Sequence, residues 1–410
     1  MSDRLHTYAG GPLAVSAVPG AGKTHMLTEL AVRLVTERGV PPSEILVLTY
    51  MREAAEQLRS RLTGALASRG HRPAGLTVTT IHAFCLGLLR EAEAAPRRTL
   101  AESERTQILF AALDRYLEDP QRRRAWELAH PPAGRYDDPR RETVEAARQA
   151  LSVAKLHGLT LDSLPPDLAA MAAHYEAERQ RLGALDFDDQ IREALTLLEA
   201  RPELLARLRA RHRYLLEDEA QDSTVAQARL LSLLAGEGGH LVRVGDPNQA
   251  ITSTFTASDP REFRAFCDRL AAAGRHLTIV TSSRSGAPLL AIANHLVALA
   301  ARHPDPVIAS ALAPVTIAPT GRLNPPPAEC GAAFHAYETA DRERLGVLAA
   351  IRRHLARHPE DRVAVLLPTN REVDRYTELF SHAGLPVVAG ASPRLPAQVL
   401  AMLEATLRAI

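Results

Sequence analysis

The sequence predicts an α/β fold with a parallel sheet, and three observations support this fold class. Short runs of β-branched and aliphatic residues alternate with stretches of helical period, the pattern of a parallel sheet covered by helices. A glycine-rich loop joins the first of these runs to a helix. Two later runs end in clusters of acidic and turn-forming residues. Together these features indicate a sheet with chemically active residues at its strand ends.

Six strands are expected before residue 286. They are Leu13–Ala17, Glu44–Tyr50, Leu76–Ile81, Tyr214–Glu217, Leu241–Val244 and Leu277–Val280. From about Leu86 to Leu182 the strand signals stop, and an Arg-, Glu- and Ala-rich stretch of helical period predicts a helical insertion. Its clusters Arg122–Arg124 and Arg140–Arg141 could touch phosphates, but acidic residues are about as numerous, which favours a solvated helical surface.

The last section resembles the start of a second α/β domain. A Pro-rich connector, Pro304 to Pro327, precedes expected strands near Phe334–Tyr337, Val363–Leu367 and Leu385–Val388. The final segment, Pro396–Ile410, has the period of an amphipathic helix but no later segment to cover its apolar side. We therefore expect that the chain is cut inside a domain.

Composition limits the class of protein. The 410 residues are 46% hydrophobic and 24% charged, within the range of soluble globular proteins. The sequence has no apolar run long enough for a membrane span, and its three scattered cysteines fit neither a disulfide framework nor a zinc cluster. A cytoplasmic protein is expected. Because the formal net charge is only +1, any affinity for nucleic acid must come from a local groove.

The strongest local signal is the segment AVPGAGKT, which follows a strand and opens a helix as a P-loop does. Gly20 and Gly22 allow backbone N–H groups to turn inward around phosphate oxygens. Lys23, one of two lysines in the chain, would reach the β- and γ-phosphates of ATP, and the Thr24 hydroxyl would ligate Mg²⁺. The alternative, a fortuitous glycine turn, does not account for the strand and helix on either side. The residues expected to hold the nucleotide are Ala17, Val18, Pro19, Gly20, Ala21, Gly22, Lys23 and Thr24.

Two further segments carry polar residues directly after strands. In LLEDEAQD, Asp218 would hold Mg²⁺ and Glu219 would be the general base for the attacking water. Alone, such an acidic pair is more often a helix cap or a solvated turn, and the P-loop favours the functional interpretation. In VGDPNQAI, Gln249 could hydrogen-bond the γ-phosphate, presented by a type I turn at Asp246.

Taken in order, six motifs resemble the UvrD/Rep group of superfamily 1 DNA helicases. They are AVPGAGKT, LTYMREAAEQL, TTIHAFC, DEAQD, GDPNQAI and VTSSRS. The order and spacing match over nearly the whole chain, and the helical insertion falls where that group has its 1B subdomain. The segment Leu185–Gln190, LDFDDQ, corresponds to the return from the insertion. The resemblance implies RecA-like domains, a first one at residues 1–86 and 184–285, the insertion at 87–183, and an incomplete second one at 286–410.

The resemblance also assigns contacts to DNA and to the γ-phosphate. Tyr50 corresponds to an aromatic residue that stacks on a DNA base, and Thr80 and His82 match a segment beside the DNA track. Without the resemblance, Tyr50 would also fit an interior aromatic and His82 a structural histidine. Arg284 corresponds to an arginine that reaches the γ-phosphate, and Phe255 would take over a second stacking position with a shifted register.

The sequence departs from the group at several places. Residues 1–15 contain no glutamine, which the group uses to contact adenine, and Met51, Arg52 and Glu53 stand where Thr-Asn-Lys is common. Thr254 and Phe255 replace an aromatic residue followed by arginine. No segment after Arg284 matches the late motif that carries a second arginine, so this chain alone is expected to lack what unwinding requires.

The resemblance implies ATP-driven 3′-to-5′ movement on single-stranded DNA and strand separation, in repair or recombination. ATP and Mg²⁺ are the expected cofactors, single-stranded DNA and duplex junctions the substrates, and repair proteins the candidate partners. Two alternatives stay open, an ATP-binding regulatory paralogue without helicase activity and the helicase portion of a helicase–nuclease. A P-loop kinase or GTPase does not explain DEAQD followed by GDPNQAI.

Overall fold

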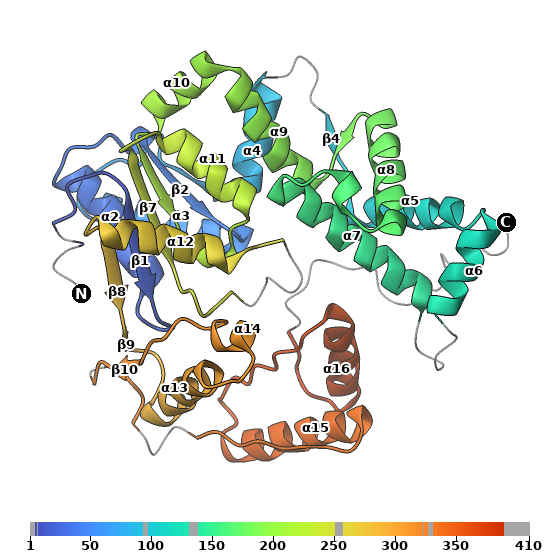
Figure 1. Ribbon diagram of the computed structural model, residues 1–410. Coiled ribbons are helices and arrows are strands. Elements are labelled where there is room, and N and C mark those ends of the chain that lie inside the picture. Colours follow the sequence, from blue (N-terminus) through green and yellow to red (C-terminus); the bar gives the residue numbers. More distant parts are fainter. Residues whose placement is uncertain are drawn as a thin grey trace. The chain divides into compact units, whose positions relative to one another are not determined.

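The computed structural model describes residue 5 and residues 7–92, 97–130, 138–250, 257–321, 323–326 and 331–388 (Figure 1). The chain forms two compact units, residues 1–331 and 332–410. The larger unit contains the parallel sheet and the helical insertion. No described helix has the length and apolar character needed to cross a membrane.

The sheet has six parallel strands in the order β3-β2-β6-β7-β1-β8. Their bounds are β1 Leu13–Ala17, β2 Ile45–Thr49, β3 Thr77–Thr80, β6 Tyr214–Glu217, β7 His240–Gly245 and β8 His276–Ile279. All six expected strands are present, with ends that differ by one residue at most. The predicted α/β class with a parallel sheet is confirmed.

Helices cover both faces of this sheet, because its central strands are apolar on both sides. Ile45 and Val47 of β2 pack with α2 (Lys23–Thr36) and α3 (Arg52–Ala67). Leu46 and Leu48 of the same strand face the opposite way, into a second buried cluster. That cluster includes residues of α4 (Ile81–Ala92), α9 (Phe187–Ala200), α10 (Pro202–Arg211), α11 (Val225–Ala235) and α12 (Pro260–Ala272). Two-sided burial explains the nearly unbroken apolar runs of the strands.

The predicted insertion is helical and has its own core. It contains α5 (Glu102–Tyr116), α6 (Pro120–Ala129), α7 (Pro139–His157) and α8 (Pro166–Arg181), which pack around Leu109, Leu151 and Tyr175. Two short strands at its base, β4 (Arg98–Thr99) and β5 (Ala184–Leu185), pair in parallel. The sequence did not predict these strands, because two residues are too few to show a period.

Beyond β8 the described residues form helices joined by extended segments and two short strands. The first unit ends with β9 (Thr281–Ser282), α13 (Ala287–Ala301), α14 (Pro306–Ala309) and β10 (Ala318–Pro319), and the second unit contains α15 (Ala340–Arg357) and α16 (Asn370–His382). Single 3₁₀ turns lie at Pro42–Glu44, Leu161–Ser163 and Ala220–Asp222.

The three strands predicted near Phe334–Tyr337, Val363–Leu367 and Leu385–Val388 are wrong. Those segments lack ladder partners in the described part of the second unit, and Phe334, Leu366 and Val388 are 94%, 93% and 98% exposed. An apolar run becomes a strand only where a neighbour pairs with its backbone.

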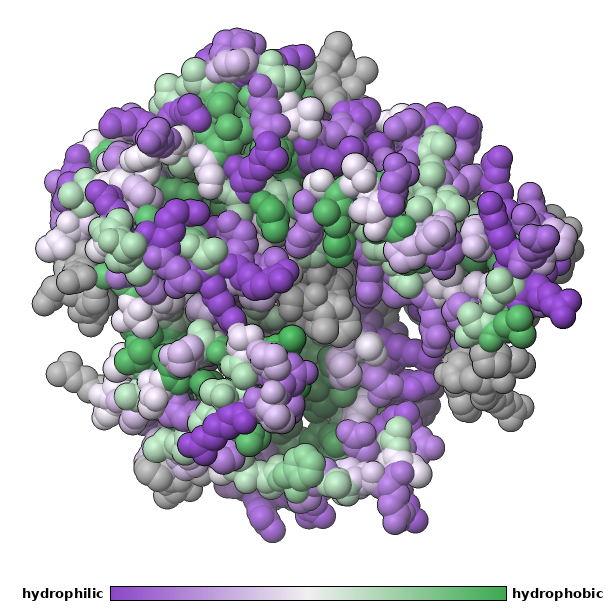
Figure 2. All heavy atoms as spheres, viewed as in Figure 1, coloured by the Kyte–Doolittle hydropathy of each residue, from purple (hydrophilic) through white to green (hydrophobic). Residues whose placement is uncertain are grey.

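Hydrophobic residues also reach the surface around α13 (Figure 2), where Leu296 and Leu299 are exposed. The expected helix Pro396–Ile410 lies outside the described residues.

Candidate functional site

The glycine-rich loop runs from the end of β1 into the first turn of α2. Gly20 and Gly22 have φ angles of 74° and 83°, a left-handed conformation that glycine adopts without strain. Gly22 is the N-cap of α2, and no acidic residue lies in the first turn of that helix. The helix therefore begins with unpaired N–H groups and the positive end of its dipole, both of which favour a bound phosphate.

Lys23 points toward residues that follow two other strands. Its Nζ donates to Gln249 Oε1 at 3.0 Å and lies 3.8 Å from Glu219 Oε2. The side chain is only 9% exposed. Parallel strands end at the same edge of a sheet, so β1, β6 and β7 bring these three residues together although the sequence separates them widely.

Asp218 lies between Thr24 and the backbone of Glu219. The Thr24 hydroxyl donates to Asp218 Oδ2 at 2.9 Å, and the Glu219 amide donates to Asp218 Oδ1 at 3.1 Å. Burial and the charge of Glu219 raise the pKa of Asp218 to about 6. A buried carboxylate paired with a hydroxyl is a suitable set of oxygen ligands for Mg²⁺.

Glu219 has a backbone conformation that is unusual for its residue type. Its φ of 56° and ψ of 45° lie in the left-handed region, and among the described residues it is the one non-glycine residue with a positive φ. Such strain costs roughly 1–2 kcal/mol and clusters at functional sites. Gln221 supports the conformation, because its Nε2 donates to Glu219 Oε2 at 2.9 Å.

The turn predicted after β7 is present. The backbone N–H of Gln249 donates to the backbone carbonyl of Asp246 at 3.0 Å. The backbone N–H of Asn248 donates to Asp246 Oδ1, also at 3.0 Å. Gln221 joins this turn to Glu219, since its Oε1 accepts from the Asp246 amide at 2.9 Å. Gln221, a 2%-exposed residue of the DEAQD segment, was not predicted from the sequence, because its connecting role depends on contacts across two strands.

The residues of this edge fit ATP with Mg²⁺. Asp246 is 2% exposed, and its Oδ2 has no hydrogen-bond partner among the described residues. Burial raises the pKa of Asp246, and the charge of Lys23 opposes that rise. Buried polar atoms are nearly always satisfied, so an oxygen without a protein partner beside the P-loop suits a hydrated cation or a nucleotide. Lys23 and the loop amides would hold phosphates, and Thr24 and Asp218 the metal.

Arg284 lies directly against the P-loop. A Cβ on Gly20 would come within 2.6 Å of both Arg284 Cβ and Ser282 Oγ, so only glycine allows this approach. The amide and the hydroxyl of Ser283 each donate to Gly20 O at 3.0 Å. The Arg284 side chain itself is exposed, and in the described residues it makes no hydrogen bond or ion pair. Its guanidinium is therefore available to a ligand in the loop.

The predicted DNA residues behave differently from one another. Tyr50 and His82 line a cavity of about 310 Å³ between the sheet and the insertion. Burial lowers the pKa of His82 despite the nearby charge of Asp188, so the imidazole is neutral at pH 7. Thr80 is buried and does not line this cavity, and its Oγ1 accepts from the Ala83 amide at 3.2 Å at the start of α4. Phe255 lies outside the described residues.

The cavity contains one further aromatic residue that was not predicted from the sequence. Phe187, in the LDFDDQ segment, is 40% exposed, and its ring meets His82 edge to face at 6.0 Å between centroids. A phenylalanine between two aspartates was the available signal in the sequence. Tyr50, His82 and Phe187 place three ring-bearing side chains in the cavity lining, as a surface that stacks bases would have.

Comparison with known proteins is consistent with this geometry. Residues 3–270 match the family described as UvrD/REP helicase N-terminal domain. The chain is 31% identical to the ATP-dependent DNA helicase UvrD1 of Mycobacterium tuberculosis (strain ATCC 25618 / H37Rv) over 307 residues, 71% of this chain and 38% of the relative. It is 28% identical to UvrD2 of the same strain over 385 residues, 92% of this chain and 52% of the relative.

A third relative is the ATP-dependent DNA helicase PcrA of Leuconostoc citreum, 30% identical over 245 residues, 59% of this chain and 31% of the relative. The chain thus spans about half or less of the length of these curated relatives. The family match covers well over half of the chain, including the P-loop, the acidic segment DEAQD and the turn segment GDPNQAI. The chain belongs to the UvrD/REP helicase N-terminal domain family.

Proposed function

We propose that this chain is the nucleotide- and DNA-binding part of an ATP-driven DNA helicase. It hydrolyses ATP to ADP and phosphate and moves 3′ to 5′ along single-stranded DNA, in repair or recombination. The proposal rests on four residues that lie together at one edge of the sheet, Lys23, Asp218, Glu219 and Gln249. In that order, they suit the phosphates, the metal, the attacking water and the γ-phosphate. The relatives named above are ATP-dependent DNA helicases, which supports the same activity.

Each residue then has a defined role in hydrolysis. The P-loop amides and Lys23 bind the β- and γ-phosphates. Thr24 and Asp218 would hold Mg²⁺, which would neutralise charge on these phosphates, and Glu219 accepts a proton from the attacking water. Gln249 and Arg284 contact the γ-phosphate, so they distinguish the nucleotide before and after hydrolysis.

Single-stranded DNA would bind at the aromatic cavity. Tyr50 and Phe187 present ring faces or edges to unstacked bases, and neutral His82 contacts the strand without adding charge. Thr80 acts indirectly, by capping the helix that carries His82. We retain the division into residues 1–86 with 184–285, 87–183 and 286–410 as the proposed domain organisation.

The decisive measurement is ATP binding and turnover by residues 1–410, with and without single-stranded DNA. Lys23→Ala should weaken ATP binding and remove any hydrolysis that the parent shows, since one positioned contact commonly contributes about 3 kcal/mol to the transition state. DNA binding should survive in this variant. Arg69→Ala, which removes an exposed ion pair with Glu29, is the matched control and should change neither property. Unchanged ATP affinity in Lys23→Ala would exclude the site.

A further inference from the structure

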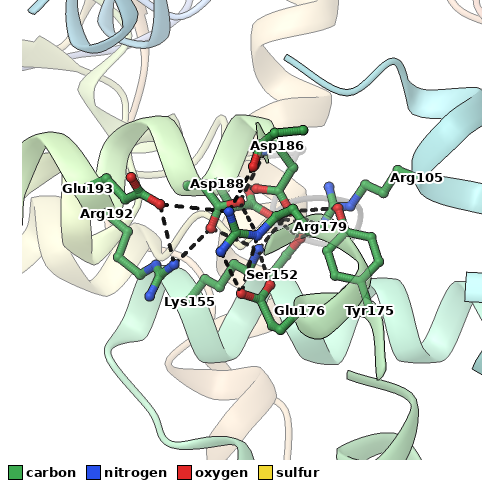
Figure 3. A network of polar contacts seen from close by, with 12 residues as sticks. Arg105, Ser152, Lys155, Tyr175, Glu176, Arg179, Asp186, Asp188, Arg192 and Glu193 are labelled. Atoms are coloured by element: carbon green, nitrogen blue, oxygen red, sulfur yellow. Dashed lines mark hydrogen bonds and ion pairs between the residues drawn. The ribbon is translucent and has the colours of Figure 1, made fainter. Parts of the chain in front are cut away.

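A network of buried charges joins the helical insertion to the first turn of α9 (Figure 3). Lys155 of α7 lies at one centre, with its Nζ 2.6 Å from Glu176 Oε1, 2.7 Å from Asp186 Oδ2 and 3.0 Å from Asp189 Oδ1. These three carboxylates are close enough to one another to hold a metal ion, but the Lys155 ammonium occupies the space between them. Asp186 and Asp189 are almost fully buried and cap α9 reciprocally.

Arg105 of α5 is the second centre. Its Nη2 donates to Asp188 Oδ2 at 2.8 Å and to Ser152 Oγ at 3.0 Å, and Ser152 Oγ donates to the same carboxylate oxygen at 2.6 Å. Burial opposes the charge of Arg105, but Asp188 and Asp186 outweigh it and raise the pKa of the guanidinium. Arg105 is 4% exposed, so its charge is neutralised inside the protein and does not face solvent.

Phe187 lies between these two anchored aspartates. Lys155 holds Asp186 on one side of it, and Arg105 holds Asp188 on the other, while the Phe187 ring itself is 40% exposed. Arg105, Ser152 and Asp188 line the same cavity as the ring. The Arg105 side of the network therefore forms part of the wall of the cavity in which the Phe187 ring meets His82, and Lys155 lies behind that wall.

Stability alone is a weak explanation for such a network. Removing ions from water offsets most of their attraction, so apolar residues of similar volume often stabilise a protein as well or better. What such a network supplies is geometry, because each hydrogen bond restricts one side-chain position, although Arg105 Nε is among the buried atoms that have no hydrogen-bond partner in the described structure. We propose that Arg105 and Lys155 are positioning residues for DNA binding, which hold the first turn of α9 so that Phe187 meets a DNA base. This inference rests on the proposed function.

The first test is the affinity for a single-stranded oligonucleotide at several salt concentrations. Arg105→Met should weaken binding by about tenfold, the scale expected when one stacked base is lost. Arg105→Lys should restore part of the affinity. The slope of log affinity against log salt should stay that of the parent, because a positioning residue contacts no phosphate. A slope smaller by about 0.7 would instead mean that Arg105 binds a phosphate directly, and would overturn the inference.

A second variant, Asp188→Asn, is one for which charge and positioning predict opposite changes in DNA affinity. Asp188→Asn removes a negative charge from the wall of the cavity and leaves Arg105 with only the more distant Asp186 carboxylate, at 3.9 Å, so electrostatics alone predicts tighter DNA binding. Positioning predicts weaker binding, because Arg105 and Ser152 lose the carboxylate that orients them. Tighter binding by Asp188→Asn would contradict the inference. Arg181→Met on α8, an exposed arginine paired only with Glu178 in the described structure, is the control and should leave the affinity unchanged.

A third readout needs no DNA. Phe187→Trp in a Trp126→Phe background places the chain's only tryptophan in the cavity. Adding Arg105→Met or Lys155→Met should lower the fluorescence anisotropy of that tryptophan and shift its emission to longer wavelength, while ATP-analogue binding at the P-loop shows that the fold is retained. Unchanged emission and anisotropy in both variants would overturn the inference. If the parent binds no single-stranded DNA, the proposed function fails, and this fluorescence comparison still decides the positioning.

Discussion

Two neighbouring carboxylates at the end of β6 have different environments and therefore different expected roles. Asp218 is 5% exposed and contacts Thr24, whereas the Glu219 side chain is 37% exposed and lies 3.8 Å from Lys23. The buried carboxylate suits a metal ligand, and the accessible one suits a base that meets water. Substitution at each position should therefore give a separate phenotype.

Glu219→Gln should preserve ATP affinity and lower turnover by roughly two to four orders of magnitude, the usual contribution of a general base. The amide keeps the shape of the side chain but cannot accept the proton from water. Nucleotide titration and single-turnover hydrolysis, in a form of the protein with measurable activity, separate the two effects. Turnover at the parent rate would show that Glu219 is only a structural acid at a strand end.

Asp218→Asn should stabilise the ligand-free protein while abolishing its response to Mg²⁺. Because the folded-state pKa of Asp218 is raised to about 6, folding favours the protonated form, and that contribution to stability is lost as the pH rises through about 6. At pH 8 the neutral amide should increase the free energy of unfolding by about 1–3 kcal/mol. The gain should disappear below about pH 4, where both states of the parent are protonated.

Thermal unfolding across pH 4 to 8 measures this difference, with Mg²⁺ absent. In the parent, the affinity for Mg²⁺ should fall as the pH drops through about 6, since the metal requires the ionised carboxylate. A variant that is less stable than the parent at pH 8 would contradict the assigned pKa shift.

At the scale of elements, the contact between the P-loop and the segment around Arg284 depends on one glycine. Gly20→Ala would place a methyl group 2.6 Å from Arg284 Cβ and force a left-handed φ on alanine. We expect a loss of about 1–3 kcal/mol in stability and a measurable loss of ATP affinity. Gly64→Ala in the middle of α3 is the contrasting control, because it meets no atom within 4 Å and should stabilise by about 0.5–1 kcal/mol. Equal effects of the two substitutions on unfolding would refute the tight contact.

Elements with strong local signals were predictable from the sequence. Strands such as Leu13–Ala17 and Tyr214–Glu217 are apolar runs buried on both faces, so their limits follow from hydrophobicity alone. Contacts at the sites depend on long-range pairing and were not predictable in the same way. Arg105 and Asp188 are 83 residues apart, and no local pattern marks them as partners. The expected strands after residue 331 failed for the same reason, since pairing decides whether an apolar run becomes a strand.

At the scale of the whole molecule, the residues proposed to bind the nucleotide all come from one of the two compact units. Lys23, Asp218, Glu219 and Gln249 belong to the unit that contains the large sheet, and Arg284 lies at the P-loop from the segment after β8. No segment after Arg284 resembles the motif that carries a second arginine. An arginine of this kind can contribute about 10³–10⁵ in rate.

We therefore expect purified residues 1–410 to bind nucleotide and single-stranded DNA weakly and not to unwind a duplex with a 3′ overhang. The measurement is a strand-displacement assay on protein whose intact mass has been confirmed, with ATP turnover recorded in parallel. Robust unwinding would mean that the catalytic arginine lies among these residues.

Heat-resistant variants selected without an activity assay should accumulate changes at Glu219. Glycine and asparagine tolerate its left-handed backbone better than glutamate does, so either replacement relieves local strain. The same replacements remove the carboxylate that faces water and Lys23. Thermostability and turnover are thus opposed at a single codon, and a stabilisation library for this protein should keep that codon constant.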